Sequence, residues 1–299
     1  MRILITGSNG FIGNYACNRL KHEHEIIGIG TKHLSTVPGI IYHKANIEDQ
    51  SFVAEIKKKV EHCDIVIHLA AQMDKDNFNY KLIDVNCRGS LNVLLLAKEL
   101  GAKKIIHSSG LTVIGKPVFL PITEEHPTSP STLYHITKLT SEQIINLGSQ
   151  HNINAVNLRI ASPVGIGMNE GTILPVLLKR CLKNQPIIIH GNGLRKQNYI
   201  DVRDVAEAIF ATIDNGIDGT FNIASETVIS NIDLANLCIK TTKSYSEITF
   251  NGKEDPEESY CWNTSILSAK KTFSFEPQYS LVDTINDMLN YWSISTISL

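Results

Sequence analysis

A tyrosine and a lysine four residues apart, Tyr134 and Lys138, are the pair of side chains in this sequence best suited to acid–base chemistry. On a helix, residues at this spacing share a face, so the Lys138 ammonium can lie near the Tyr134 phenol. A nearby positive charge lowers the pKa of a phenol from its usual value of about 10. The pair is therefore suited to acid or base chemistry by Tyr134, a hypothesis for which so short a motif needs further context.

A second chemical signal lies near the start of the chain, where Gly7, Gly10 and Gly13 are each three residues apart. They follow an apolar strand expected over Arg2–Thr6 and precede a helix whose apolar residues recur every four places from Ile12. Glycines at such a turn let backbone N–H groups approach a pyrophosphate at the helix N-terminus. The run predicts a dinucleotide site.

Short apolar strands alternate with helical segments through the first half of the chain, which is typical of a parallel sheet with crossover helices. Further strands are expected over Glu25–Ile29, Ile40–His43, Asp64–Leu69, Lys104–His107 and Asn154–Leu158. One helix is expected to end at Gly101, and later helices to begin after Ser230 and Ser280, each followed by an acid three residues on. The predicted fold class is α/β, a doubly wound parallel Rossmann sheet with a small interleaved C-terminal substrate lobe.

The predicted domain division follows where this periodicity is strong and where it weakens. The dinucleotide-binding Rossmann domain is expected over residues 1–162, with later returns near 186–242. The substrate-binding lobe is expected from 163–185 and 243–279, over the carboxyl edge of the sheet. Residues 280–299 are expected to form a terminal helix and tail.

Composition narrows the classes of partner and compartment. The 28 Lys plus Arg against 30 Asp plus Glu give a formal net charge of −2, which argues against nucleic-acid and membrane-surface partners. No apolar run reaches the ~18 residues of a spanning helix, and glycine-rich sequence begins at Gly7, too early for a signal peptide. The six widely spaced cysteines argue against a metal site and fit a reducing compartment, so a cytoplasmic protein without a metal is expected.

Further motifs follow in a fixed order. They are Ala45-Asn46-Ile47, His68-Leu69-Ala70-Ala71, Val85-Asn86-x-x-Gly89, Ser108-Ser109, Tyr134-x-x-x-Lys138, Leu158-Arg159 and Asn198-Tyr199-Ile200-Asp201-Val202-x-Asp204-Val205-Ala206. With them the sequence resembles, over nearly its whole length, the extended short-chain dehydrogenase/reductase family, the NAD-dependent epimerase/dehydratase group that mostly modifies nucleotide sugars. The resemblance implies a homodimer formed through the helix that carries Tyr134 and the long helix before it, where Leu95 and Leu139 are compatible with a contact.

The resemblance also implies which residues hold the cofactor. They are Gly7, Asn9, Gly10, Phe11, Ile12, Gly13, Asn46, Ile47, Leu69, Ala70, Ala71, Asn86 and Ser108, with Lys138 on the nicotinamide ribose. Dinucleotide folds that prefer NAD place an acid at the end of the second strand, on the ribose 2′-OH. Here that place has no carboxylate, and Thr31 and Lys32 can donate to a phosphate, which favours NADP somewhat over NAD.

The substrate side departs from the family pattern. Gly110 stands where a catalytic Ser or Thr is usual, so Ser109 or Thr112 is expected to supply the hydroxyl. The expected substrate contacts are Ser162, in place of an Asn; Gln197, in place of a diphosphate-clamping arginine; and Arg195, two residues before it on the same strand face. Residues 253–262 lack another arginine that relatives commonly have.

These observations predict an NAD(P)-dependent oxidoreductase or epimerase that transfers hydride reversibly at a secondary alcohol or ketone of a sugar, nucleotide-linked by resemblance. A 4-epimerase and a 4-ketoreductase both fit. Dehydratase chemistry is disfavoured because Leu111 and Thr112 replace the acids that it uses. The missing arginines leave open a reductase of another small ketone, and Gly110 leaves open a catalytically silent protein that senses NAD(P).

Overall fold

The computed structural model describes residues 1–214 and 216–297, and the last two residues of the predicted tail, 298–299, lie outside this range. A seven-stranded sheet forms the centre of the molecule, with all neighbouring strands parallel. Its strands, in spatial order, are β10 (Gly219–Ile223), β6 (Asn154–Ile160), β5 (Lys104–Gly110), β4 (Ile65–His68), β1 (Arg2–Thr6), β2 (Glu25–Gly30) and β3 (Ile41–Lys44). This confirms the predicted α/β class and all of the expected strands.

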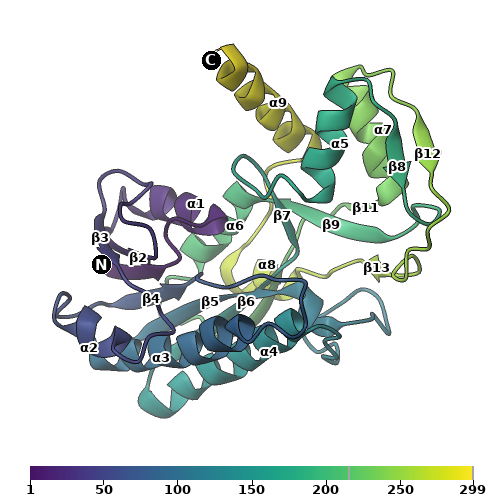
Figure 1. Ribbon diagram of the computed structural model, residues 1–299. Coiled ribbons are helices and arrows are strands. Elements are labelled where there is room, and N and C mark those ends of the chain that lie inside the picture. The colour runs from purple at the N-terminus through teal and green to yellow at the C-terminus, as the bar shows by residue number, and fades with distance from the viewer. Residues whose placement is uncertain (215, 298–299) are drawn as a thin grey trace.

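Helices cover both faces of this sheet (Figure 1). Helices α1 (Phe11–Leu20) and α6 (Val202–Ala211) lie on one face, and α2 (Phe52–Lys57), α3 (Gly89–Glu99) and α4 (Leu133–Asn146) on the other. Successive residues of a strand point to opposite faces, so Ile3 and Ile5 enter the core under α1 and α6 while Leu4 enters the core under α2 and α3. Burial on both faces explains why β1 is apolar at nearly every position.

The predicted helix end at Gly101 and the predicted helix starts at Ser230 and Ser280 are each found, with local hydrogen bonds. After α3, Gly101 has φ +72°, its N–H donates to Lys98 O at 3.1 Å, and Ala102 N donates to Ala97 O at 2.9 Å. Ser230 Oγ accepts from Asp233 N at the start of α7 (Asn231–Thr242). Ser280 caps α9 (Leu281–Ile297) in the same way, which confirms both predicted caps.

A second group of elements packs beside the sheet, at the upper right of Figure 1. Strands β7 (Ser162–Val164), β9 (Lys196–Asp201), β11 (Val228–Ser230) and β13 (Cys261–Trp262) form one small sheet, and β8 (Ile187–Ile189) pairs with β12 (Ile248–Phe250). Helices α5 (Ile173–Leu182), α7 and α9 share a separate buried cluster with these strands. Residues 186–242 were predicted to return to the Rossmann domain. Within them β10 is a strand of the main sheet and α6 packs on it, whereas α7 belongs to this second cluster. The domain division stays a prediction.

The remaining elements are short or connect these layers. They are the π-helical turn η1 (Ile83–Arg88), the 3₁₀ turns η2 (Leu111–Ile114) and η3 (Leu147–His151), and α8 (Leu267–Phe273). Among the described residues, no helix combines the length and the apolar character that crossing a membrane requires. The six cysteines are free, with Cys87 and Cys261 partly exposed and the other four buried.

Candidate active site

The glycine run forms a tight turn between β1 and α1 that leaves no room for side chains. Gly7 has φ +72°, and a Cβ added there would lie 2.7 Å from Ala70 N. A Cβ on Gly13 would lie 2.0 Å from Gly7 O, so α1 approaches the turn as closely as backbone allows. No side chain caps α1 at Gly10, and its first turn carries no acid. The N–H groups of that turn are therefore suited to an anion.

The loops that flank this turn are tied to it by side chains from the predicted cofactor set. Asn9 Oδ1 accepts from Thr36 N and Nδ2 donates to Leu34 O, both at 2.9 Å, which fixes the loop after β2. Thr31 and Lys32 are exposed in that loop. Farther along, Asn46 Nδ2 donates to Glu48 Oε1 at 2.7 Å, and the Asn46 oxygen can act as an acceptor.

A third loop, after β4, brings Leu69 and Ala70 beside the glycine turn, where Leu69 N donates to Thr6 O at 3.2 Å. Ala71 follows and is exposed. Asn86, in η1, holds the end of this loop because its Oδ1 accepts from the backbone N–H of residue 72 at 2.8 Å. Asn86 Nδ2 also donates to Thr137 Oγ1 at 2.9 Å, which joins the loop to α4.

Tyr134 and Lys138 lie on α4, which begins at the cap Thr132. Lys138 is buried, and its Nζ lies 3.1 Å from His107 Nε2 on β5. Burial lowers the pKa of Lys138 to about 8, with the charge of Glu142 opposing this change. Burial raises the pKa of Tyr134 to about 12. The predicted lowering of the Tyr134 pKa is therefore not found, because desolvation of the phenol dominates and the lysine contacts a histidine.

Two buried histidines lie beneath this pair, on neighbouring strands. Their rings stack at 5.4 Å between centroids. His68 contacts the hydroxyls of Thr6 at 2.8 Å and Ser90 at 3.0 Å, and His107 Nδ1 lies 2.9 Å from Asn157 Oδ1. Burial lowers the pKa of His68 to about 3 and that of His107 well below its usual value, so both rings are neutral. The sequence carries no local signal for the contact between His107 and the lysine.

Gly110, at the end of β5, has no side chain where a catalytic Ser or Thr was expected, and the hydroxyl of Thr112 lies beside this position. A Cβ built on Gly110 would lie 3.3 Å from Thr112 Oγ1, in η2. The Ser109 hydroxyl is buried and has no hydrogen-bond partner among the described residues. Ser108, one residue earlier on β5, is partly exposed. Both expected replacements thus lie within two residues of Gly110.

The predicted substrate contacts fall into two groups. Ser162 Oγ donates to Gln197 Oε1 at 3.3 Å, so β7 and β9 bring these two together. Arg195 instead pairs with Glu257 Oε2 at 2.9 Å and Asp255 Oδ2 at 3.5 Å. The only cation among the three predicted substrate contacts is thus already paired with two carboxylates, which sequence reasoning missed because those acids lie some sixty residues away.

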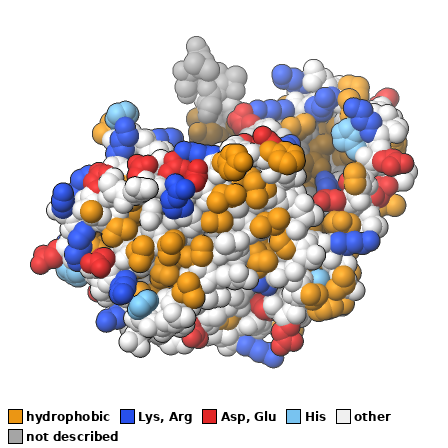
Figure 2. Space-filling model, turned by 60° about the horizontal axis from the view of Figure 1, so that its bottom comes forward, with side chains coloured by type: hydrophobic (Ala, Val, Ile, Leu, Met, Phe, Trp, Pro, Cys, Tyr) orange, Lys and Arg blue, Asp and Glu red, His pale blue; other side chains and the backbone are white. Residues whose placement is uncertain are grey.

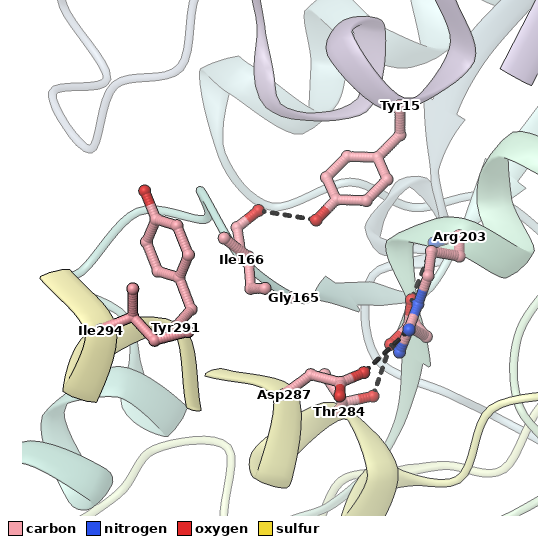
Figure 3. A pocket seen from close by; sticks show the side chains of 9 residues that line it. Tyr15, Gly165, Ile166, Arg203, Thr284, Asp287, Tyr291 and Ile294 are labelled. Atoms are coloured by element: carbon pink, nitrogen blue, oxygen red, sulfur yellow. Dashed lines mark hydrogen bonds and ion pairs between the residues drawn. The ribbon is translucent and has the colours of Figure 1, made fainter. Parts of the chain in front are cut away.

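A cavity of about 450 Å³ opens elsewhere, between α1, the loop after β7 and α9 (Figure 3). Tyr15 OH reaches across it to Ile166 O at 3.1 Å. Arg203 pairs with Asp201 and Asp287, both at 2.8 Å, so the one cation among the described lining residues is already bound by two carboxylates. None of the predicted site residues lines it. Among the described residues, no group of three His, Cys, Asp or Glu side chains could hold a metal ion.

Comparisons with known proteins agree with this fold. A putative UDP-glucose 4-epimerase from Methanocaldococcus jannaschii is 27% identical over 97% of this chain and 97% of its own length. The crystal structure of a Thermotoga maritima UDP-glucose 4-epimerase with UDP-glucose has a TM-score of 0.88 at 23% identity, covering 99% of this chain and 100% of that one. A Thermus thermophilus UDP-glucose 4-epimerase in complex with NAD has a TM-score of 0.86 at 20% identity, covering 98% and 99%. The model of the NAD dependent epimerase/dehydratase family matches residues 3–224, and the chain belongs to that family, as its motifs predicted.

Proposed function

We propose that this protein is an NAD(P)-dependent epimerase that acts on a nucleotide-linked sugar by reversible hydride transfer at a secondary alcohol. The observation that carries the proposal is the position of Tyr134 and Lys138. Both lie on α4, and Lys138 is buried against His107 of β5, which is in register, through His68 of β4, with Thr6 directly before the glycine turn. A 4-ketoreductase would use the same groups, and it differs only in releasing the reduced product.

The residues around the glycine turn fit a dinucleotide. The uncapped first turn of α1 suits the pyrophosphate, and the space that a Cβ on Gly7 or Gly13 would fill is needed for the close packing of that turn. Leu69, Ala70 and Ala71 would border the nicotinamide half, with Asn86 fixing their loop and Lys138 on the ribose. Bound there, the cofactor supplies the acceptor and donor of hydride.

Tyr134 moves the proton in this scheme. With a pKa raised by burial to about 12, the phenol is protonated at neutral pH and is poised to donate to a ketone oxygen. The oxidative half of an epimerisation needs the phenolate, which the positive charge of Lys138 favours. The balance between the phenol, which donates in the reductive half, and the phenolate, which accepts in the oxidative half, therefore depends on the position of the Lys138 ammonium.

Thr112 is proposed as the second hydroxyl. Its oxygen lies 3.3 Å from the position of the Cβ that Gly110 lacks, so it stands next to where a serine at 110 would begin. We expect Thr112→Val to lower kcat by about 10²–10³, as loss of one donor to a developing charge does. Ser109→Ala is the matched control and should leave kcat within a few-fold. A Thr112→Val kcat equal to that of Ser109→Ala would reject this assignment.

A direct test of the substrate class is a thermal-shift titration with UDP-, GDP- and dTDP-sugars and with NADH and NADPH. We expect a UDP-sugar and a reduced cofactor each to raise the Tm, and UDP-glucose and UDP-galactose to interconvert. Ser162, Gln197 and Arg195 are the proposed contacts on the sugar nucleotide. If the cofactor raises the Tm while every nucleotide leaves it unchanged, the sugar-nucleotide assignment fails.

The pairing of Arg195 with Glu257 and Asp255 favours a second candidate, a reductase of another small ketone. A paired arginine attracts a diphosphate less strongly than a free one. Oxidation of NADPH by a panel of small ketones, without any response to nucleotides, would select it. A protein that binds NADPH and never oxidises it would instead be the silent sensor.

Cofactor choice is proposed to lean toward NADP within this NAD-dependent family. No carboxylate stands at the end of β2, and Lys32 is accompanied there by His33, whose Nε2 lies 3.4 Å from Lys44 Nζ. These groups would favour a 2′-phosphate. Fluorescence titration should give a lower Kd for NADPH than for NADH, and Lys32→Glu should reverse the order. Tighter NADH binding by the wild type would reject the preference.

We also propose a homodimer formed through α3 and α4. Hydrophobic side chains gather on the face of the molecule where these helices run (Figure 2), and Leu91, Leu95 and Ile136 are exposed there. A second copy of the chain would cover this surface. Sedimentation should give a dimer that the Leu91→Glu/Leu95→Glu variant converts to monomer, whereas Leu267→Glu, an exposed residue of α8, should not. A monomeric wild type would overturn it.

The cytoplasm is the proposed compartment. Six free cysteines, four of them buried, support a reducing environment. Fractionation of the source cells should recover the protein with cytoplasmic markers, and recovery from an oxidising compartment would contradict the proposal.

A further inference from the structure

The group that contacts the Lys138 ammonium comes from the central sheet. His107 Nε2 lies 3.1 Å from Lys138 Nζ, and the two side chains are 1% and 4% exposed. The other ionisable groups that act on this lysine come from the neighbouring elements: Glu142 from α4, Cys87 from η1 and His68 from β4. The Arg159 guanidinium, on β6, donates to both carboxylate oxygens of Glu142, at 3.0 and 2.9 Å. His107 therefore makes the direct contact.

The hydrogen-bond chain behind His107 fixes which ring nitrogen carries the proton. An ammonium has donors only, so Nε2 of His107 must accept from Lys138. Nδ1 must then carry the hydrogen and donate to Asn157 Oδ1, 2.9 Å away. Asn157 in turn uses its amide nitrogen to donate to Asn146 Oδ1 at 2.7 Å. Asn146 is the last residue of α4, so the chain returns to the helix that carries the lysine.

We propose, on the basis of the function proposed above, that His107 is a positioning residue that holds the Lys138 ammonium in place and favours its charged form. When the lysine is charged, each of the three links joins one donor to one acceptor: Lys138 Nζ donates to His107 Nε2, His107 Nδ1 to Asn157 Oδ1, and Asn157 Nδ2 to Asn146 Oδ1. A neutral lysine would not require Nε2 as an acceptor, and the order of the chain would no longer be fixed. His107 itself touches neither the substrate nor the transferred hydrogen.

Loss of the acceptor should therefore change how the enzyme responds to pH. Without Nε2 the buried ammonium loses the acceptor that it has in the wild type, so its proton is lost at lower pH. The alkaline limb of the kcat profile, which reports the charged lysine, should move down by about one to two pH units in His107→Leu. His107→Gln places an amide oxygen near the position of Nε2 and should restore most of the wild-type profile.

His68→Leu is the matched control. His68 lies directly opposite His107 in the register of β4 and β5, is equally buried and stacks on the same ring. It contacts hydroxyls and not Lys138. The two leucine variants should lose similar stability, but only His107→Leu should move the alkaline limb and the pH dependence of NADH binding. If the alkaline limb of the kcat profile lies at the same pH in His107→Leu and His68→Leu, the proposal is overturned.

A measurement on the wild-type protein decides the matter without turnover. NMR of the chain with ¹⁵N-labelled histidine, assigned by His107→Gln, should show His107 protonated on Nδ1 and not on Nε2. The opposite tautomer overturns the proposal, even if the leucine variants fail to fold. Absence of turnover with every sugar nucleotide would reject the proposed function alone, because the tautomer and the NADH titrations would still report on His107.

Discussion

Replacing Gly7 by alanine tests whether the turn between β1 and α1 requires a glycine in order to bind the cofactor. Gly7 and Gly101 have the same φ of +72°, which alanine adopts only at a cost of roughly 1–2 kcal/mol. Around Gly101 nothing lies within 4 Å of an added Cβ, whereas at Gly7 the Cβ would lie 2.7 Å from Ala70 N and 2.8 Å from Ala70 Cα. Gly101→Ala is therefore a control for the backbone conformation alone.

The expected magnitudes follow from this difference. Gly101→Ala should lower the free energy of unfolding by about 1–2 kcal/mol. The Gly7 contacts are with backbone and fall roughly 0.7 Å short of van der Waals distance, so Gly7→Ala should lose a further ~1–3 kcal/mol. Relief requires the turn to move away from the loop that carries Ala70, and a displaced turn should weaken NADH binding at least about tenfold, or ~1.4 kcal/mol.

Urea unfolding and fluorescence titration with NADH measure the two quantities on each variant. Gly101→Ala should bind NADH as the wild type does, although it is less stable. If Gly7→Ala matches Gly101→Ala in both stability and NADH affinity, the turn is not constrained as described, and the assignment of this turn to a dinucleotide loses its support.

Three further outcomes are expected. Arg159→Met leaves the Glu142 carboxylate buried and unpaired, so urea unfolding should show a loss of about 3–5 kcal/mol, largely recovered in Arg159→Met/Glu142→Leu. Burial lowers the pKa of Lys104 from 10.5 to about 8. Between pH 8 and 10.5 the unfolded chain holds a proton that the folded chain has released, so the free energy of unfolding of the wild type should rise with pH in this window. Urea unfolding of Lys104→Met should lack this part of the rise. Tyr134→Phe should lower kcat by about 10²–10⁴ with NADH affinity unchanged, and near-normal turnover would reject its role as acid and base.

The sequence predicted every strand of the main sheet except β10, together with the helix ends at Gly101, Ser230 and Ser280, because those signals are local. An apolar run, a glycine at a left-handed position and a serine three residues before an acid each act over a few residues, as at Gly101 and Ser280. The small sheet escaped prediction because β7, β11 and β13 have two or three residues each and pair only with β9. Strands that short carry no periodicity.

The site was predicted unevenly for the same reason. Motif order located Tyr134, Lys138 and the glycine turn, which lie in well-formed local structure. The contact of Lys138 with His107 and the pairing of Arg195 with Glu257 join residues 31 and 62 places apart. No pattern within a single segment encodes such contacts. These two contacts also change the expected chemistry, because the Lys138 ammonium faces His107 and the Arg195 guanidinium faces Glu257.

The place of β10 at the edge of the central sheet has a consequence for biosynthesis. Strand β6 ends at Ile160, but its outer neighbour β10 begins only at Gly219, after strands β7, β8 and β9 of the smaller sheets and helices α5 and α6. While the ribosome emits that stretch, the outer backbone edge of β6 has no partner and can pair with strands of other nascent chains. Closing the sheet is thus a late event, and slowed translation before residue 219 should increase aggregation and dependence on chaperones.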